Sequence, residues 1–144
     1  MKDFDGWNER KKAISASTFD DYVHAREVWW CAIGVNIGVE ADGKHDHFER
    51  PVLILRKFSK DAVLVVCLTS SAKPDNPYHV VYSHDGREFA AIISQVRLVS
   101  TKRLIRKLFS MSEDNFMRIA GAVTEMIENK RPPLARGPRR PSGR

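Results

Sequence analysis

The sequence predicts an α+β protein, mainly β, in which short strands curl around a core and one helix closes the end. Short apolar runs rich in Val and Ile alternate with clusters of Gly, Pro, Asp and Asn, which is typical of strands joined by turns. A single amphipathic stretch follows them, at residues 112–129. Together these features favour a small SH3-like β-barrel closed by a C-terminal amphipathic helix. A β-sandwich with an appended helix is the alternative.

Three parts are expected along the 144 residues. Residues 1–26 are expected to form a polar leader that contains a short helix from Trp7 to Ser15. Residues 27–129 would be the barrel domain, which is long enough to bury a proper core. Residues 130–144 would be a basic, Pro- and Arg-rich tail, disordered because it has too little apolar surface to order itself.

The positive charge of the chain comes from this tail. The chain carries 24 basic and 18 acidic residues, and six of the basic ones follow Asn129, so that residues 1–129 carry 18 of each. The tail could simply keep the protein soluble, or it could be a loose electrostatic tether for nucleic acid.

The first strand is expected within Glu27–Ile37, where Trp, Val and Ile are frequent. The polar loop 38–49 follows it. Two more strands are expected at Arg50–Leu55 and Ala62–Leu68, joined by the turn Phe58–Asp61. These two runs would form a hairpin of neighbouring strands.

Further strands are expected in the second half of the chain. Tyr78–Tyr82 and Glu88–Ile93 flank an Asp-Gly dipeptide at residues 85–86, which is a strong hairpin signal. Gln95–Val99 alternates between polar and apolar residues, as a half-buried strand does. Leu104–Phe109 follows a turn and would be the last strand.

The closing helix has a clear start. Ser112 suits the N-cap, and Glu113 and Asp114 place acids in the first turn, where the helix dipole favours them. The helix is expected to end near Asn129. Its apolar face is expected to consist of Phe116, Ile119, Ala120, Val123 and Ile127.

Composition predicts a soluble, cytoplasmic protein without membrane association. The longest apolar run, Ala62–Leu68, is far below the ~18 residues that a membrane span needs. The start Met1–Asp5 lacks the apolar stretch of a signal peptide. Cys31 and Cys67 lie inside apolar runs without Cys-x-x-Cys spacing, so we expect reduced core thiols rather than a disulfide or zinc ligands.

Arg50 and Thr69 are the candidate functional pair. Arg50 begins one strand of this hairpin and Thr69 ends the next, and a hairpin places the start of one strand beside the end of the other. The guanidinium and the hydroxyl would therefore lie at one rim of the sheet. A bidentate Arg fork with a neutral hydroxyl donor suits a phosphate group.

With these segments placed, the chain resembles the MazF/PemK family of toxins from type II toxin–antitoxin systems. The resemblance spans about residues 7–128, and the leader Trp7–Lys12 is similar to the longer PemK-like branch. The matching stretches are Glu27–Cys31, Gly34–Glu40, Asp42–Lys44, Arg50–Ile54, Leu68–Ser70, Ser94–Leu98 and Lys102–Leu104.

The resemblance implies a homodimeric, SH3-like endoribonuclease that cuts single-stranded RNA, including mRNA, at short sequences without a metal or cofactor. It also implies a cognate antitoxin that blocks the site and binds DNA as part of the complex. Arg50 and Thr69 fall on positions that are functional in many family members. We therefore expect both to be catalytic.

Six other residues are expected to bind the substrate. Glu40 and Gln95 fall on positions that the family associates with the site. Arg97 belongs to a basic cluster that would follow the RNA backbone or form a solvated face. The full set is Glu40, Lys44, His47, Ser70, Gln95 and Arg97.

The chemistry needs a group that Arg50 and Thr69 do not supply. In metal-free cleavage the 2′-hydroxyl attacks its own phosphate and leaves a 2′,3′-cyclic phosphate and a 5′-hydroxyl. Arg50 can stabilise the developing negative charge, but its guanidinium does not titrate near neutral pH. We expect the base in the loop before Arg50, with Glu40 and His47 as candidates. His45 lies in the same loop, but the pair of histidines lacks further metal ligands.

Two readings without catalysis stay open at this point. The same fold class includes toxins that bind DNA gyrase through the C-terminal helix, and the chain could also be an RNA-binding module. A gyrase inhibitor would not need Arg50 and Thr69 at the rim of the sheet, which favours the nuclease.

Overall fold

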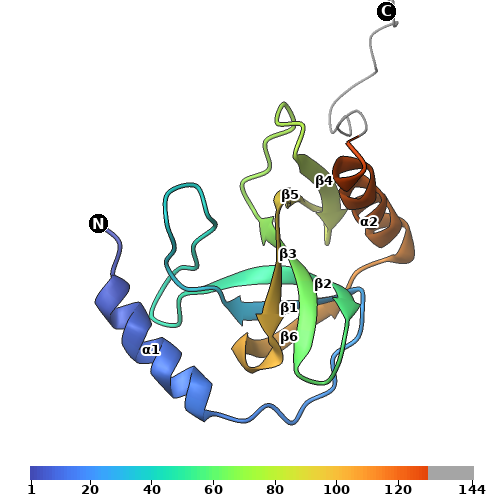
Figure 1. Ribbon diagram of the computed structural model, residues 1–144. Coiled ribbons are helices and arrows are strands. Elements are labelled where there is room, and N and C mark those ends of the chain that lie inside the picture. Colours follow the sequence, from blue (N-terminus) through green and yellow to red (C-terminus); the bar gives the residue numbers. More distant parts are fainter. Residues whose placement is uncertain (130–144) are drawn as a thin grey trace, which may run out of the picture.

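The computed structural model describes residues 1–129, and the predicted tail at 130–144 lies outside the described residues. Figure 1 shows a bent sheet with one helix at each side. The elements in chain order are α1 (Phe4–Ala16), β1 (Glu27–Ala32), β2 (Glu49–Lys57), β3 (Ala62–Thr69), β4 (His79–His84), β5 (Arg87–Ser100), the 3-10 turn η1 (Thr101–Arg103), β6 (Leu104–Ser110) and α2 (Glu113–Ile127).

The six strands form one antiparallel sheet in the order β4-β5-β3-β2-β1-β6. The predicted α+β fold class is confirmed. The sheet is strongly curled, but within residues 1–129 no pairing joins the two end strands β4 and β6, so the barrel is open there. In Figure 1, α2 lies against β4 and β5, and α1 lies on the opposite side beside the loop 33–48.

One difference from the prediction concerns β5. The expected strands Glu88–Ile93 and Gln95–Val99 are a single strand of 14 residues. Its first half pairs with β4 and its second half pairs with the start of β3. Val66 of β3 pairs with Val96 and the next residue, Cys67, pairs with Ile92, so residues 93–95 of β5 form a bulge between the halves. A bulge bends a strand without ending it.

Side chains of alternating direction divide the interior into two apolar clusters. Val28 and Leu53 face the cluster that α2 covers, together with Ile119. Trp29 and Val52, their neighbours in sequence, face the other cluster. Because successive residues of a strand point to opposite faces, the same strands supply both clusters.

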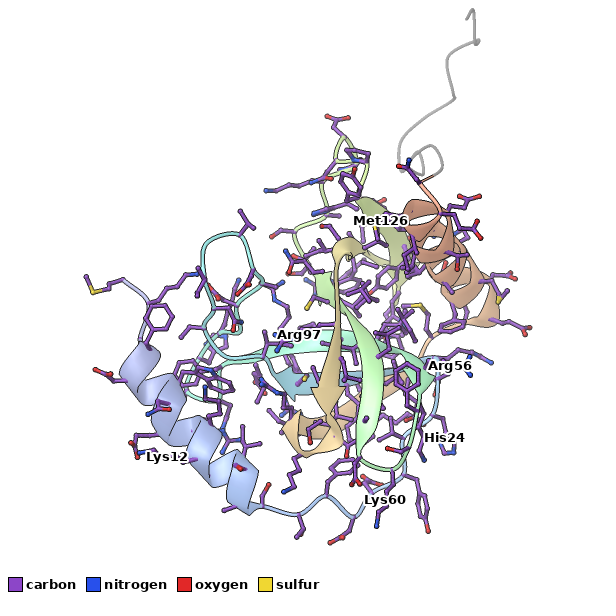
Figure 2. The ribbon with its side chains drawn as sticks, viewed as in Figure 1. Lys12, His24, Arg56, Lys60, Arg97 and Met126 are labelled. Atoms are coloured by element: carbon purple, nitrogen blue, oxygen red, sulfur yellow. The ribbon has the colours of Figure 1, made fainter. Side chains whose placement is uncertain are left out.

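The helix α2 begins as predicted. The Ser112 side chain accepts a hydrogen bond from the Asn115 backbone N at 3.2 Å, which confirms the N-cap. The side chain of Met126, a residue of α2, packs against the apolar cluster between the helix and the sheet (Figure 2). Ile127, predicted on the apolar face, is 72% exposed because it lies in the last turn, beyond the edge of the sheet, and the buried Ala122 contributes to the face instead.

The leader helix α1 is longer than predicted and begins at Phe4. Asp3 Oδ1 accepts a hydrogen bond from the Gly6 backbone N at 2.8 Å, so Asp3 is the N-cap. Trp7 is the buried residue of this helix, with 6% of its surface exposed. Trp7 therefore holds α1 against the body of the protein, together with the hydrogen bond that Lys102 Nζ donates to Ser15 O at 3.0 Å.

The strand β1 is shorter than predicted and ends at Ala32. The chain leaves the sheet at Gly34, which has a φ of +89° that residues with a side chain rarely adopt.

Cys31 of β1 and Cys67 of β3 are fully buried free thiols. Burial raises the pKa of the Cys31 thiol to about 12. No described helix is long and apolar enough to cross a membrane.

Candidate functional site

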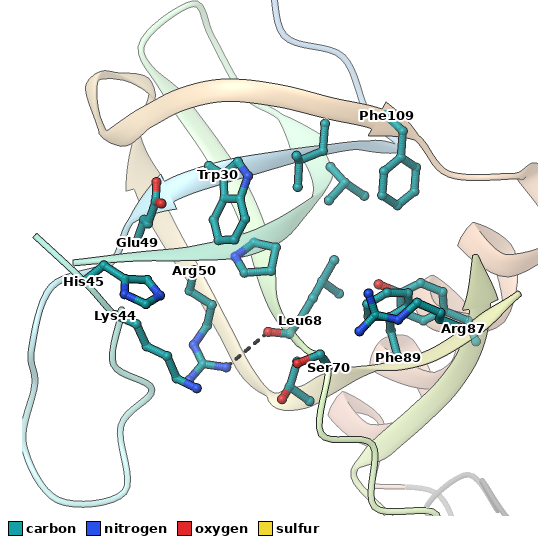
Figure 3. Close-up of a pocket in the computed structure, with 15 residues that line it drawn as sticks. Trp30, Lys44, His45, Glu49, Arg50, Leu68, Ser70, Arg87, Phe89 and Phe109 are labelled. Carbon is teal, nitrogen blue, oxygen red and sulfur yellow. Dashed lines mark hydrogen bonds between the residues drawn. The ribbon is translucent and has the colours of Figure 1, made fainter. Parts of the chain in front are cut away.

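A pocket of about 390 Å³ opens at the rim where β2 begins and β3 ends (Figure 3). The lining combines aromatic residues with polar and basic ones. The aromatic residues are Trp30, Tyr82, Phe89 and Phe109, and the polar and basic residues are Lys44, His45, Glu49, Arg50, Thr69, Ser70 and Arg87. Such a combination suits a ligand with a flat ring and a negative charge.

Arg50 is held in place by two backbone carbonyls. Its Nε donates to Asp42 O at 2.7 Å and its Nη1 donates to Leu68 O at 3.1 Å. Asp42 lies in the loop before β2, and Leu68 lies in β3, so the guanidinium joins the loop to the sheet. A guanidinium has five N–H groups, and most of them stay available for an anion.

Thr69 lies next to the carbonyl that holds Arg50 and lines the same pocket. Its Oγ1 accepts a hydrogen bond from the Ser71 backbone N at 3.0 Å. The hydroxyl proton can therefore be donated to a ligand. Ser70 is exposed beside it on the pocket wall. The structure thus brings together Arg50 and Thr69, as the hairpin argument predicted, and places Ser70 on the same pocket. The roles of all three stay predictions.

The loop before β2 presents a different histidine from the one expected. His45 lines the pocket together with Lys44, whereas His47 is exposed and does not line it. His45 has a φ of 65° and Phe48 a φ of 52°, so the chain turns sharply around these residues. Figure 3 shows the His45 ring near Lys44 and Arg50.

Glu40 does not line the pocket either. Its Oε1 accepts a hydrogen bond from the Ile37 backbone N at 3.0 Å, within the tip of the loop 33–48. Gln95 supports this loop from β5, because its Oε1 accepts from Ala41 N at 3.0 Å and its Nε2 donates to Val39 O at 2.9 Å. Glu40 and Gln95 therefore shape the loop, and only the loop reaches the pocket.

Arg97 lies on β5 outside the pocket, on the side of the loop 33–48 (Figure 2). Burial lowers the pKa of the Arg103 guanidinium, and the charge of Arg97 lowers it further. Arg103 donates to Ala32 O at 3.1 Å, and its Cζ lies 5.5 Å from the centre of the Trp7 ring. The two arginines thus form a partly buried cationic pair beneath the loop.

Three residues that line the pocket were not among the expected site residues. Trp30 follows the buried Trp29 and points into the pocket, where the Cζ of Arg106 lies 5.3 Å from the centre of its ring. Glu49 precedes Arg50, and its Oε1 lies 3.7 Å from Arg106 Nη1. Arg87 follows the hairpin turn, with its Cζ 5.5 Å from the Phe89 ring centre.

The sequence contains a signal for Trp30. Trp29 and Trp30 must point in opposite directions on a strand, so one of them had to leave the core. Glu49 adjoins the candidate Arg50, but nothing in the sequence shows that β1 and β6 enclose its carboxylate. Within residues 1–129, no cluster of three His, Cys, Asp or Glu side chains is arranged to hold a metal ion.

Residues 24–127 match the family model described as PemK-like, MazF-like toxin of type II toxin-antitoxin system. The chain belongs to this toxin family. The match begins after α1, so the leader helix is an addition to the part that the PemK-like, MazF-like family model describes. No curated protein matches the sequence.

Solved structures of MazF toxins share the fold. MazF from Deinococcus radiodurans has a TM-score of 0.61 and 21% identity over 75% of this chain and 99% of that chain. A MazE-MazF structure from the same organism has a TM-score of 0.56 and 19% identity over 74% of this chain and 97% of that chain. An endoribonuclease in complex with its cognate antitoxin from Mycobacterial species has a TM-score of 0.55 and 13% identity over 75% of this chain and 96% of that chain.

Proposed function

We propose that the protein is a toxin endoribonuclease that cuts single-stranded RNA, including mRNA, at short sequences in the cytoplasm. The observation that supports this function best is the position of Arg50. Its guanidinium is fixed by two carbonyls in a pocket that Thr69 and several aromatic residues also line. Family membership adds independent support.

The proposed reaction is a transesterification without a metal. The 2′-oxygen forms a bond to phosphorus as the bond from phosphorus to the 5′-oxygen breaks. A base removes the proton of the 2′-hydroxyl, and an acid gives a proton to the leaving 5′-oxygen. The products are a 2′,3′-cyclic phosphate and a 5′-hydroxyl.

Arg50 and Thr69 act on the phosphate in this scheme. A fixed guanidinium aimed at the phosphoryl oxygens stabilises the charge that develops there, and it needs no rearrangement during the reaction. The Thr69 hydroxyl donates to a second oxygen, because its own acceptor is already occupied by Ser71 N. Neither residue exchanges a proton near neutral pH.

His45 is the proton acceptor that the pocket geometry favours. Its ring lies on the pocket wall near Lys44 and Arg50 (Figure 3), and imidazole exchanges protons readily near neutral pH. It takes the role that the sequence assigned to Glu40 or His47. The aromatic residues of the lining, with Trp30 among them, offer a surface on which an unpaired RNA base can stack.

Partners follow from the family. The MazE-MazF structures support a cognate antitoxin as a partner of this chain. In this proposal the antitoxin covers the pocket and, as part of the complex, binds DNA, as the family resemblance implies. A homodimer is likewise expected from the MazF-like family. Sedimentation of the purified protein would test the homodimer, and a monomer at tens of micromolar would contradict it.

The test of the function is an RNA cleavage assay in chelator. Purified protein is mixed with a mixed-sequence RNA and both new ends are mapped, beside the Arg50→Ala and Thr69→Ala variants. Lys12→Ala is the control, because Lys12 pairs with Glu9 on the exposed face of α1.

We expect cleavage by the wild type and the control, with 2′,3′-cyclic phosphate ends, and strongly reduced cleavage by both pocket variants. Ends with a 3′-hydroxyl and a 5′-phosphate would contradict the mechanism. Equal cleavage by all variants would contradict the site, and no cleavage of any RNA would leave a binding role instead.

A further inference from the structure

The helix α1 contacts the loop that carries the functional residues. It precedes the family match at residues 24–127, and it lies beside the loop 33–48 in Figure 1. That loop contributes Lys44 and His45 to the pocket and the carbonyl of Asp42 to Arg50. The contacts between α1 and the loop therefore bear on the pocket, although α1 does not line it.

Trp7 is the apolar contact. Its ring centre lies 5.6 Å from that of Phe48, at the end of the loop, and Arg103 covers it as a cation. The backbone of Gly34, at the start of the loop, approaches so closely that an added Cβ would lie 2.2 Å from Trp7 Cε2. Trp7 thus touches both ends of the loop.

Lys2 is the polar contact. Its Nζ lies 3.1 Å from Asp42 Oδ2 and donates to the backbone carbonyl of Asn36 at 2.6 Å. About a third of each charged side chain is exposed, at 33% for Lys2 and 30% for Asp42. The pair is more sheltered than an ordinary surface ion pair, which contributes little because water screens it.

Asp42 connects this ion pair to Arg50. Its Oδ1 accepts from Asn36 N at 2.6 Å, and its backbone carbonyl accepts from Arg50 Nε at 2.7 Å. The ammonium of Lys2 is therefore separated from the guanidinium of Arg50 by a single residue. The side chain of Asp42 faces Lys2 and its main chain faces Arg50.

We propose that Lys2 and Trp7 are positioning residues that hold the loop 33–48 so that the Asp42 carbonyl orients Arg50 for the phosphate. The catalytic consequence rests on the proposed function, while the contacts do not. A purely structural role for α1 would change the stability of the protein but would leave the Arg50 guanidinium as it is.

The matched comparison is Lys2→Met against Lys12→Met. Both substitutions remove one ammonium and keep most of the aliphatic stem. Lys12 lies within α1, whereas Lys2 lies just before it, and Lys12 pairs with Glu9 at 3.2 Å, away from the loop. Lys2→Arg keeps the charge, and Trp7→Phe removes part of the apolar contact while it preserves an aromatic ring.

Two readouts are needed, and one of them does not depend on RNA. The first is the solvent exchange of the Arg50 Nε–H, followed by NMR and assigned with Arg50→Lys. It is slow while the hydrogen bond to Asp42 O persists. The second is the steady-state cleavage of RNA, resolved into kcat and KM.

In Lys2→Met we expect Nε–H exchange to become at least about threefold faster and kcat to fall roughly tenfold with little change in KM. Trp7→Phe should change both readouts in the same direction. Lys2→Arg and Lys12→Met should resemble the wild type.

Unchanged exchange in Lys2→Met would overturn the proposal, whatever happens to cleavage. Faster exchange with an unchanged kcat would overturn the link to catalysis, and equal effects in Lys12→Met would show a general loss of structure. If the wild type cleaves no RNA, the proposed function fails, and the Nε–H exchange alone decides whether Lys2 positions Arg50.

Discussion

Arg50 Nη1 donates to the backbone carbonyl of Leu68 at 3.1 Å, across the hairpin of β2 and β3. This hydrogen bond is drawn as a dashed line in Figure 3. It fixes the guanidinium beside the next residue in the chain, Thr69, and it explains why two residues far apart in sequence form one site. The predictions below begin from this arrangement.

The substitution Arg50→Lys should abolish most of the cleavage activity. Lysine keeps the charge, but a single ammonium cannot bind the carbonyls of Asp42 and Leu68 and still present a fork to a phosphate. We expect kcat to fall roughly 100-fold, as when a fixed donor to a developing anion is removed. The control is Arg56→Lys, which lies on β2 outside the pocket, and kinetics on a short RNA measure both. A smaller loss in Arg50→Lys than in Arg56→Lys would disprove the assignment.

His45→Gln should lower the cleavage rate by about 100-fold, because the amide of glutamine cannot take over the proton of the 2′-hydroxyl. His47→Gln is the matched control, two residues away and outside the pocket. Kinetics on a short RNA measure both variants. Equal rates in His45→Gln and His47→Gln would refute the role of His45.

Glu27 should contribute stability that depends on pH. It is 7% exposed, and its Oε1 accepts from Trp29 Nε1 at 2.9 Å. Burial works to raise the pKa of Glu27, but hydrogen bonds from the Trp29 side chain and from the backbone and ring of His24, with the charge of Lys107, lower it overall. Because the pKa in the folded state is lowered, the carboxylate stabilises the protein above the pKa of the unfolded state. This contribution is lost as the pH falls through the pKa of the folded state.

The test is the free energy of unfolding in denaturant. Glu27→Ala leaves the buried Trp29 indole N–H without its acceptor and should cost about 2 kcal/mol at neutral pH. Glu27→Gln keeps an acceptor and should cost less. The gap between the wild type and Glu27→Gln should shrink as the pH is lowered below the normal range of a carboxyl. A gap that is constant with pH would show that the charge of Glu27 does not matter.

Gly34→Ala should destabilise the protein more than Gly38→Ala. Both glycines have a positive φ, +89° and +57°, which disfavours alanine. An added Cβ at Gly34 would collide with the Trp7 ring, whereas at Gly38 it meets nothing within 4 Å. We expect about 1 kcal/mol for Gly38→Ala from the backbone alone and about 3 kcal/mol for Gly34→Ala with the collision added. Equal thermal shifts would contradict the contact between Trp7 and the loop.

The sequence was sufficient where local chemistry decides the structure. Ser112 is followed by two acids and then by an apolar face, and this pattern specifies the start of α2 wherever the helix lies. The hairpin that unites Arg50 and Thr69 likewise needs only two apolar runs and a short turn. In both cases the pattern that predicts the structure lies within one short stretch of sequence.

The sequence was insufficient where distant contacts decide. His45 and His47 are equivalent in a polar loop, and only the turns of the backbone around the loop place one of them on the pocket wall. The hydrogen bond from Arg50 to Asp42 is accepted by a main-chain carbonyl. Every residue has such a carbonyl, so no pattern of side chains predicts this hydrogen bond. The continuity of β5 depends on a bulge within β5 itself, at residues 93–95, where its register with β3 shifts.

The buried thiols give the molecule an internal reporter. Cys31 is directly opposite Arg50 in the pairing of β1 with β2, and none of its surface is exposed. A thiol reagent can reach it only when the strands separate, because the thiolate is the reactive form and burial disfavours it. The rate at which the reagent labels Cys31 therefore reports how often the sheet opens next to Arg50, in the native chain and without an introduced cysteine.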